Sequence, residues 1–447
     1  MSAADESRER PSSSAGDCPL PPALQTRNLS IYAACMGLLY LAAPVTYVGV
    51  TQGALCNSLG ASATLANIPT SAYFATSAGP VLFAWFVPYV SWLRRNLVIC
   101  FLTVAATQAL VAVALVTSVS DELKIGAVIL QSALAGIFGT SAIGFLWEML
   151  GRGVSENRRG LTLSLAFGVG PILAALGSLG QQALLNDDIR GRWFPGLDFP
   201  WNFATLYALA CPMMALAALL VSFCAVPLPD QELRREPFFE GVFGGIWSFL
   251  TNRVLLTATV VTVLIYAGNN IASNMNLYSE EVLGAAPAEY AGLQLFFRFS
   301  FKAVAGLLMG WLLTKSHPKA GILTTGGLYI LSQVWAILAV GNSYLIAFGI
   351  YGAGELIGVY APNYILSASR PDCIRRNLAF VMMLGVPTAP FATMFGAITD
   401  HLAGEYGLAT GFRVSFATCA AIMLAGMMIA VVCLPRRPNP VASLEVV

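Results

Sequence analysis

The sequence has 447 residues, of which 57% are hydrophobic and only 11% are charged, and its net charge is +1. A chain this apolar lies outside the composition of soluble domains, and it lacks the surplus of basic residues that nucleic-acid-binding proteins carry. We therefore expect a protein of the lipid bilayer that has no nucleic-acid partner.

Residues 1–27 are polar and rich in Ser and Pro, and they lack the apolar core of a signal peptide. We expect them to form a disordered cytoplasmic tail. Beyond them lie twelve apolar runs of about 20 residues or more, the length that crosses a bilayer core. The runs fall near residues 29–52, 65–91, 96–118, 124–148, 161–185, 202–227, 254–278, 289–313, 319–340, 344–367, 378–400 and 412–435.

Basic residues are distributed unevenly between the two sides of these spans. Most of the 24 Lys and Arg residues fall in connections that lie on the same side as the N-terminal tail. Because Lys and Arg collect on the cytoplasmic side of membrane proteins, the pattern predicts a multi-pass protein of the cytoplasmic (inner) membrane with both termini in the cytoplasm.

The longest polar connection separates the sixth span from the seventh. Its second part has apolar residues at helical spacing, which predicts an amphipathic helix in the membrane interface. Similar features recur in the two halves, such as Arg pairs before the fifth and eleventh spans, and this favours a duplicated six-helix unit. The predicted parts are a six-helix bundle (28–227), a cytoplasmic linker (228–252), a second six-helix bundle (253–436) and a cytoplasmic tail (437–447).

Arg298 and Lys302 lie near the middle of the eighth span. A cation at the centre of a spanning helix costs about 2.5–3.5 kcal/mol even on the lenient insertion scale, so such residues normally face a bundle interior or a wet cavity. Their spacing of four places both on one helix face. Glu355, midway along the tenth span, is the expected counter-ion, and two cations against one acid leave a positive cavity.

Two interpretations of these charges are open. In the first, the cations bind an anionic or zwitterionic solute and Glu355 carries a proton. In the second, the three residues form a structural ion pair between the eighth and tenth helices, with Glu355 as a fixed counter-ion.

Twelve spans arranged as six plus six, a long central connection and matched basic turns after the second and eighth spans resemble the major facilitator superfamily of transporters. The resemblance covers roughly residues 28–436. The loop signature of that family survives partly, as Gly310-x3-Thr314-Lys315 in the second half and as Arg94-Arg95 in the first. Val90 stands where the signature has the Asp of a charge latch that steadies the outward-facing state.

The resemblance implies an all-α membrane protein whose twelve helices form two pseudo-symmetric six-helix bundles. It also implies that helices one, four, seven and ten line a central cavity, and that the bundles rock about a site near the midplane. These four helices carry polar and aromatic stripes. The predicted substrate contacts, besides the three charged residues, are Tyr40, Tyr47, Gln131, Tyr266, Asn269, Asn270, Ser273 and Tyr351.

Glu148 lies at the cytoplasmic end of the fourth span, shortly before Arg158 and Arg159. We expect these residues to form a gate salt bridge, with substrate contact as the alternative role of Glu148.

The residues do not favour an enzyme. Only two histidines occur and there is no phosphate-binding glycine loop, so we expect no metal, no cofactor and no ATP hydrolysis. The sequence predicts a monomeric, proton-coupled secondary transporter that works by alternating access on a small polar or anionic organic solute. Efflux of amphipathic compounds, or a non-transporting membrane receptor of the same fold, are the alternatives.

Overall fold

The computed structural model describes residues 20–87, 89–227, 251–369 and 383–438, together with Trp247, Phe249, Phe380 and Val381. The regular structure in these ranges is helical. The predicted linker 228–252 and the tail 437–447 fall almost wholly outside them.

The first half contains six crossings, several of which are built from collinear pieces. In chain order they are α1 (Pro22–Leu41), α2 (Ala43–Thr46) and α3 (Val50–Ser58); α4 (Ala63–Thr76) and α5 (Gly79–Phe86); η1 (Val90–Trp92) and α6 (Leu93–Val116); α7 (Asp121–Leu134), the π-helical η2 (Ala135–Gly139) and α8 (Thr140–Gly153); α9 (Glu156–Leu185); and, after the short α10 (Asp187–Trp193), α11 (Trp201–Val221).

The second half repeats this plan. Its crossings are α13 (Arg253–Ile265), η4 (Tyr266–Asn270) and α14 (Ala272–Leu283); α15 (Pro287–Lys315); α16 (Pro318–Leu338); η5 (Gly341–Tyr344), α17 (Leu345–Gly354) and α18 (Ile357–Ala368); η7 (Met383–Thr388) and α20 (Ala389–Tyr406); and α21 (Leu408–Cys433).

Eight helical segments in the described ranges are long and apolar enough to cross a membrane by length and composition alone. Some of the other predicted spans are interrupted. The first is divided between Leu41 and Val50, and the second between Thr76 and Gly79. A break in the middle of a crossing shortens each helical piece without shortening the path across the bilayer.

The predicted tail 1–27 ends earlier than the sequence indicates, because α1 begins at Pro22. Proline is well suited to the first turn of a helix, where its missing N–H is not needed. Gln25 also anchors this turn, since its Nε2 donates to Leu20 O at 2.9 Å and its Oε1 accepts from the Ser155 N–H at 3.1 Å. Gln25 is therefore buried at the start of α1, whereas Thr26 and Arg27 beside it are exposed.

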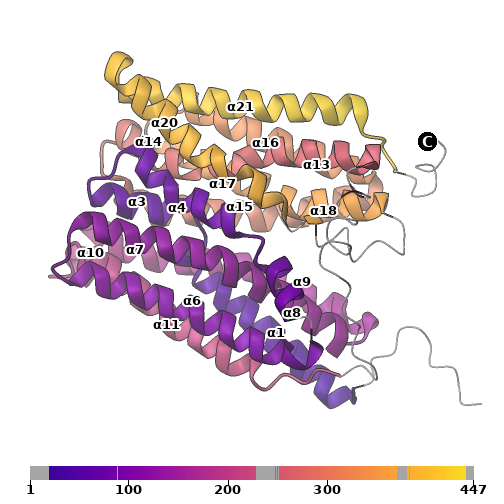
Figure 1. The fold of residues 1–447 in the computed structure, drawn as a ribbon. Coiled ribbons are helices and arrows are strands. Elements are labelled where there is room, and N and C mark those ends of the chain that lie inside the picture. Colours follow the sequence, from indigo (N-terminus) through magenta and orange to yellow (C-terminus); the bar gives the residue numbers. More distant parts are fainter. Residues whose placement is uncertain are drawn as a thin grey trace, which may run out of the picture.

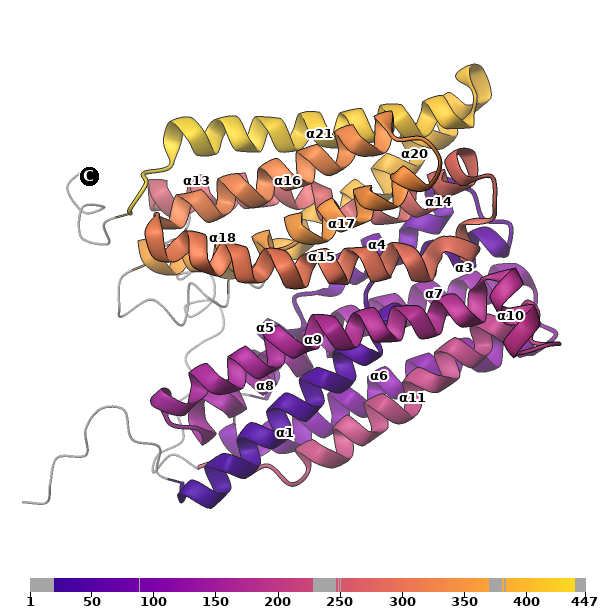
Figure 2. The ribbon, with the colours of Figure 1, turned by 180° about the vertical axis from the view of Figure 1, so that it is seen from behind.

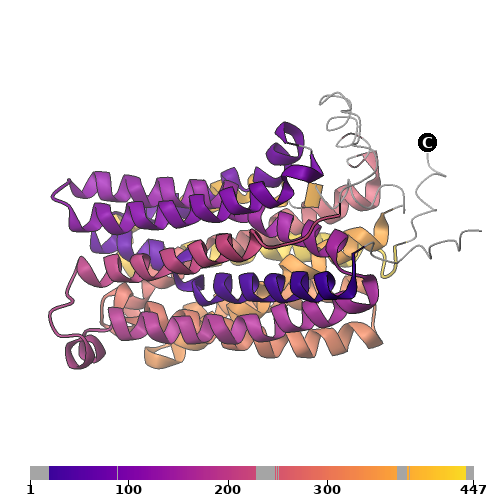
Figure 3. The same ribbon diagram turned by 90° about the horizontal axis from the view of Figure 1, so that it is seen from below.

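The helices form two bundles that lie side by side (Figure 1). One contains α1, α6, α8, α9 and α11, and the other contains α13, α15, α16, α18 and α21. Across the seam, α9 packs against α15 and α4 packs against α20. The start of α1 and the end of α21 lie at the same end of the molecule, which we call the terminal end (Figure 3). The opposite end, which we call the far end, is formed by α3, α10 and α14.

Hydrogen bonds join the two bundles in the far half of the molecule. Asp400 of α20 accepts the backbone N–H groups of Ala63 and Thr64, at 3.0 and 2.8 Å, at the start of α4. Deeper in the seam, Asn67 donates to Asn274 at 2.5 Å. The ribbons of the two bundles diverge toward the terminal end (Figure 2).

Close backbone contact at this seam requires glycine at position 292. A Cβ added there would lie 2.4 Å from the backbone nitrogen of Gln182, which is closer than real contacts allow. With glycine in place, Gln182 bonds across the seam, donating to Glu289 O at 2.7 Å and accepting from the Leu293 N–H at 2.9 Å. The far half is therefore closed by bonds that involve backbone groups of both bundles.

Replacing Asp400 by Ala should weaken this closure, because a carboxylate on two helix N-terminal N–H groups gains from both the hydrogen bonds and the helix dipole. We expect the equilibrium between closed and open far ends to shift by about 1.5–3 kcal/mol toward the open form. Distances between spin labels on Ser58→Cys and Tyr406→Cys would report the change. Glu405→Gln, on the same helix and exposed, is the matched control. Identical distance distributions in the Asp400 variant and the control would contradict the role of Asp400.

Candidate functional site

The three charged residues of the eighth and tenth spans meet inside the second bundle. Arg298 of α15 donates from Nε to Glu355 Oε2 at 2.9 Å and from Nη2 to Glu355 Oε1, so the pair is bidentate. The Arg298 side chain is 4% exposed and that of Glu355 is 7% exposed. The ion pair of the second interpretation is therefore present in the structure.

The backbone brings these two helices unusually close together. A Cβ at position 352 would lie 2.0 Å from the carbonyl oxygen of Arg298, so only glycine fits at this crossing of α15 and α17. Glu355 follows directly in the interruption between α17 and α18. The Glu355 carboxylate therefore reaches Arg298 from a point where the helix of the tenth crossing is interrupted.

Lys302 lies one helical turn from Arg298, nearer the terminal end of α15. Its Nζ is 3.4 Å from Glu355 Oε2, a longer bond than those of Arg298, and its side chain is 14% exposed. One carboxylate therefore serves two cations, and the cluster keeps a surplus positive charge. Lys302 is the more exposed and the more loosely held of the two cations.

The first bundle contributes an aromatic face to the cluster. The ring of Tyr47 lies 5.5 Å from the Arg298 guanidinium carbon and 5.4 Å from Lys302 Nζ, within the range of cation–π attraction. Tyr40 stacks on Tyr47 with the ring centroids 6.5 Å apart. Tyr40 lies at the end of α1 and Tyr47 lies within the interruption between α1 and α3. This face of the cluster therefore belongs to the bundle interface.

One donor of the guanidinium remains available. Arg298 Nη1 is buried and has no hydrogen-bond partner among the described residues. An N–H group of a buried cation is costly to leave unpaired, so this nitrogen is suited to an oxygen acceptor that the protein does not supply.

Residues of η4 and α16 form the next layer. Asn269 accepts from the hydroxyl of Tyr329 at its side chain and from that of Tyr351 at its backbone carbonyl, the latter at 3.1 Å. The Tyr351 ring in turn lies 5.1 Å from the Arg298 guanidinium carbon. Asn270 donates to Tyr266 O at 3.0 Å.

Tyr329 was missed by the sequence reasoning. It belongs to the ninth span, which the family resemblance does not place at the cavity. A polar stripe at steps of four, Thr325, Tyr329 and Gln333, is the signal in that span that could have pointed to it.

Two other predicted contacts lie away from the charged cluster. Ser273 donates to Gly49 O at 3.1 Å and lies 3.1 Å from the Thr70 hydroxyl, so it bonds across the seam between the bundles. Gln131 is buried in α7 and accepts from the hydroxyl of Ser132. Helical spacing predicted which face of the helix these side chains occupy. The packing of the helices determined which residues they bond to.

Two of the three predicted gate residues have partners within the described part of the structure. Glu148 accepts from Arg152 Nε at 2.7 Å, which their spacing of four residues in α8 makes possible. Arg158 donates to the hydroxyl of Thr26 at 3.1 Å and to the Pro22 carbonyl at 3.3 Å, which ties the start of α9 to α1. Arg159 belongs to α9, but its side chain lies outside the described part of the structure.

The arrangement is suited to binding an anionic group rather than to bond-breaking chemistry. Its cations and aromatic rings can hold a carboxylate or phosphate together with an apolar or ring portion of a solute. Within the described ranges, no three His, Cys, Asp or Glu side chains gather in a way that could hold a metal ion.

The losses from removing the two members of the buried pair should not add. We expect Arg298→Met or Glu355→Gln to lower the free energy of unfolding by about 3–5 kcal/mol, because each breaks the bidentate bond and leaves its buried partner short of a counter-charge. The double variant should lose less than the sum of the two. Unfolding in detergent measures all three, with Lys315→Met, an exposed cation of the same helix, as control. Strictly additive losses would show that the bond contributes nothing to stability.

The sequence matches no family model and no curated protein. Solved structures match over nearly the whole chain. A D-xylose-proton symporter is 14% identical, covers 92% of this chain and 98% of its own, and has a TM-score of 0.69. The nucleoside transporter NupG is 10% identical, with 91% and 98% covered and a TM-score of 0.64. A bacterial homologue of the human lysosomal transporter Spinster, in an inward-facing and unoccupied conformation, is 12% identical, with 94% and 100% covered and a TM-score of 0.66. The chain therefore has the twelve-helix, two-bundle fold of the major facilitator superfamily transporters.

Proposed function

We propose that this protein is a secondary active transporter that moves a small organic anion or zwitterion across the cytoplasmic membrane by alternating access, coupled to protons. The observation that carries the proposal is the surplus positive charge of the buried cluster formed by Arg298, Lys302 and Glu355. Charge buried in the middle of a membrane protein is expensive and usually marks a solute or ion path.

The cluster offers two places to a negative group. One is the free Nη1 of Arg298, and the other is Lys302, which is held to Glu355 by a single 3.4 Å contact. A carboxylate or phosphate at either place would neutralise the surplus charge and form charge-assisted hydrogen bonds. The stacked rings of Tyr40 and Tyr47 supply a surface for the rest of the solute.

Glu355 is the group that we assign to proton coupling. It holds both cations at once, so an arriving anion competes with it for them. Protonation of Glu355 removes that competition, and solute and proton then enter the site together. Among the structures with this fold is a D-xylose-proton symporter, which supports proton coupling as a mechanism available to the fold.

The positions of the contacts between bundles support alternating access. The far end is held closed by Asp400, Asn67 and Gln182, whereas the bundles diverge toward the terminal end (Figure 2). With the basic residues of the loops placed in the cytoplasm, this is an inward-facing arrangement. Opening to the other side requires these bonds to break while others form near the terminal end.

Efflux of amphipathic compounds is the second candidate. The aromatic rings around the cluster favour it. The ring of Tyr47 packs edge-on against that of Phe299, with the ring centroids 5.2 Å apart, and this adds apolar surface beside the cluster. The positive charge of the cluster would restrict such compounds to neutral or anionic ones.

Lys302 should be required for transport. In proteoliposomes, we expect Lys302→Met to lower anion uptake at least about tenfold, which corresponds to loss of one charge-assisted contact of about 1.5 kcal/mol. Lys302→Arg should restore part of the flux. A thermal-shift screen of carboxylates and phosphates on the purified protein identifies the solute to use, and Lys315→Met is the control. Undiminished uptake by Lys302→Met would leave the cluster with a structural role only.

Glu355 should be required for coupling. With a pH-sensitive dye inside the vesicles, addition of solute to the wild-type protein should move protons in the same direction as the solute. Glu355→Gln should abolish this proton movement yet allow exchange of labelled for unlabelled solute, because exchange needs no net proton transfer. Exchange also shows that the variant is folded. Solute-driven proton movement that persists in Glu355→Gln would assign the coupling to another group.

A further inference from the structure

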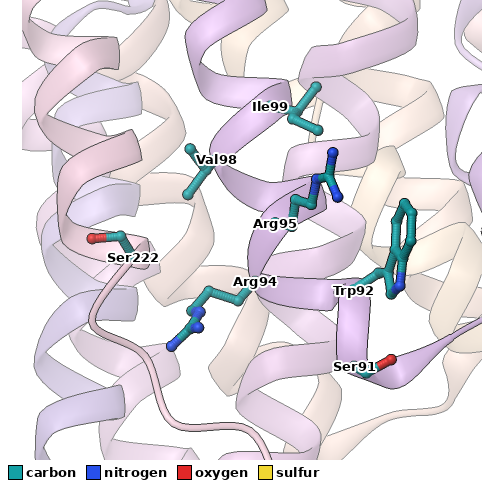
Figure 4. Close-up of a pocket in the computed structure, with 7 residues that line it drawn as sticks. All are labelled: Ser91, Trp92, Arg94, Arg95, Val98, Ile99 and Ser222. Atoms are coloured by element: carbon teal, nitrogen blue, oxygen red, sulfur yellow. The ribbon is translucent and has the colours of Figure 1, made fainter.

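A second cationic site lies at the surface, where the third crossing begins. A cavity of about 500 Å³ opens beside η1 and the first turns of α6, and Trp92, Arg94, Arg95, Val98 and Ile99 are among its lining residues (Figure 4). It is separate from the buried cluster, since it lies at the terminal end of the first bundle, on the outside of α6.

The cavity has positive charge without a counter-ion. Neither Arg94 nor Arg95 forms an ion pair with any described residue, and both are exposed. The Arg95 guanidinium carbon lies 4.8 Å from the centre of the Trp92 ring, which holds this side chain at the rim. The start of α6 adds the positive end of a helix dipole, and its N-cap residue Trp92 makes no side-chain capping bond.

The part of the cavity wall that continues from the arginines toward the middle of the span is apolar. Val98 and Ile99 lie one turn further along α6, toward the middle of the span, and Ile99 is 39% exposed (Figure 4). Trp92 at the rim is 42% exposed, and tryptophan is typical of the boundary between headgroups and hydrocarbon. A soluble anion would use the arginines but would gain nothing from this wall, whereas a lipid uses both.

We propose that this cavity binds an anionic phospholipid, with the phosphate on Arg95 beside Trp92 and an acyl chain along Ile99, while Arg94 on the other side of α6 adds to the positive potential (Figure 4). The bidentate geometry of guanidinium groups suits phosphate oxygens. The proposal rests on the orientation inferred above, in which the terminal end faces the cytoplasm and its leaflet of anionic lipids. It does not depend on the transported solute.

Native mass spectrometry of the purified full chain tests the site directly. The probes are dimyristoyl phosphatidylglycerol, which is anionic, and dimyristoyl phosphatidylethanolamine, which is zwitterionic. A basic residue at a membrane surface contributes about fivefold in affinity, so Arg94→Gln with Arg95→Gln should weaken binding of phosphatidylglycerol about thirtyfold. Binding of phosphatidylethanolamine should be weaker from the start and should change little.

Arg436→Gln with Arg437→Gln is the matched control, because it removes another exposed arginine pair at the terminal end. Its affinity for phosphatidylglycerol should stay within about twofold of the wild type. A melting temperature equal to that of the wild type shows that each variant is folded. Equal loss in both double variants, or no loss in either, would overturn the proposal.

A further experiment distinguishes a site for lipid from a site for soluble phosphate. Inorganic phosphate at millimolar concentration should fail to displace the bound phosphatidylglycerol, since it lacks the acyl chains that contact the apolar wall. In addition, Ile99→Asn should weaken binding of phosphatidylglycerol, although both arginines remain in place. Displacement of the lipid by phosphate, together with full retention by Ile99→Asn, would make this a site for soluble anions and would overturn the lipid assignment.

Discussion

The unequal charge of one buried cluster is the constraint on which much of this structure depends. Two cations and one acid in the middle of a membrane protein are tolerated only where geometry and partners compensate for lost hydration. The bidentate bond between Arg298 and Glu355 supplies the partner. The glycine at position 352 permits the close approach of α15 and α17, and Tyr47 from the other bundle supplies an aromatic face. The cluster keeps a surplus positive charge, since one carboxylate faces two cations.

Interruptions occur in each of the four crossings expected to line the cavity. The first is broken between α1 and α3, the fourth contains η2, the seventh contains η4 and the tenth is interrupted at Glu355. Breaks free backbone groups that need new partners in a membrane interior. Side chains provide several of them: Gln52 donates to Val45 O at 2.8 Å, and Tyr351 donates to Asn269 O. The breaks in the first, seventh and tenth crossings lie next to the charged cluster or to its neighbouring tyrosine Tyr351, and discontinuous helices commonly hold solutes in transporters.

The closure between the bundles is asymmetric. In the family that the chain resembles, an Asp beside the second helix forms a charge latch, and Val90 occupies its place here. The described structure has a carboxylate at the far end, where Asp400 of α20 accepts the first backbone N–H groups of α4. A latch at the far end stabilises the arrangement that is closed on that side.

The sequence alone determined the number and approximate positions of the spans, and the presence of Arg298, Lys302 and Glu355 within them, because hydropathy and helical period are local properties. The same period placed Tyr47 and Tyr351 on inward faces. Only the tertiary structure decided that Glu355 pairs bidentately with Arg298, that Tyr329 joins the site, that Ser273 bonds across the seam and that Glu148 pairs with Arg152. Periodicity fixes which face of a helix a side chain occupies. Which other helix meets that face, and at what depth, depends on contacts between residues far apart in the chain.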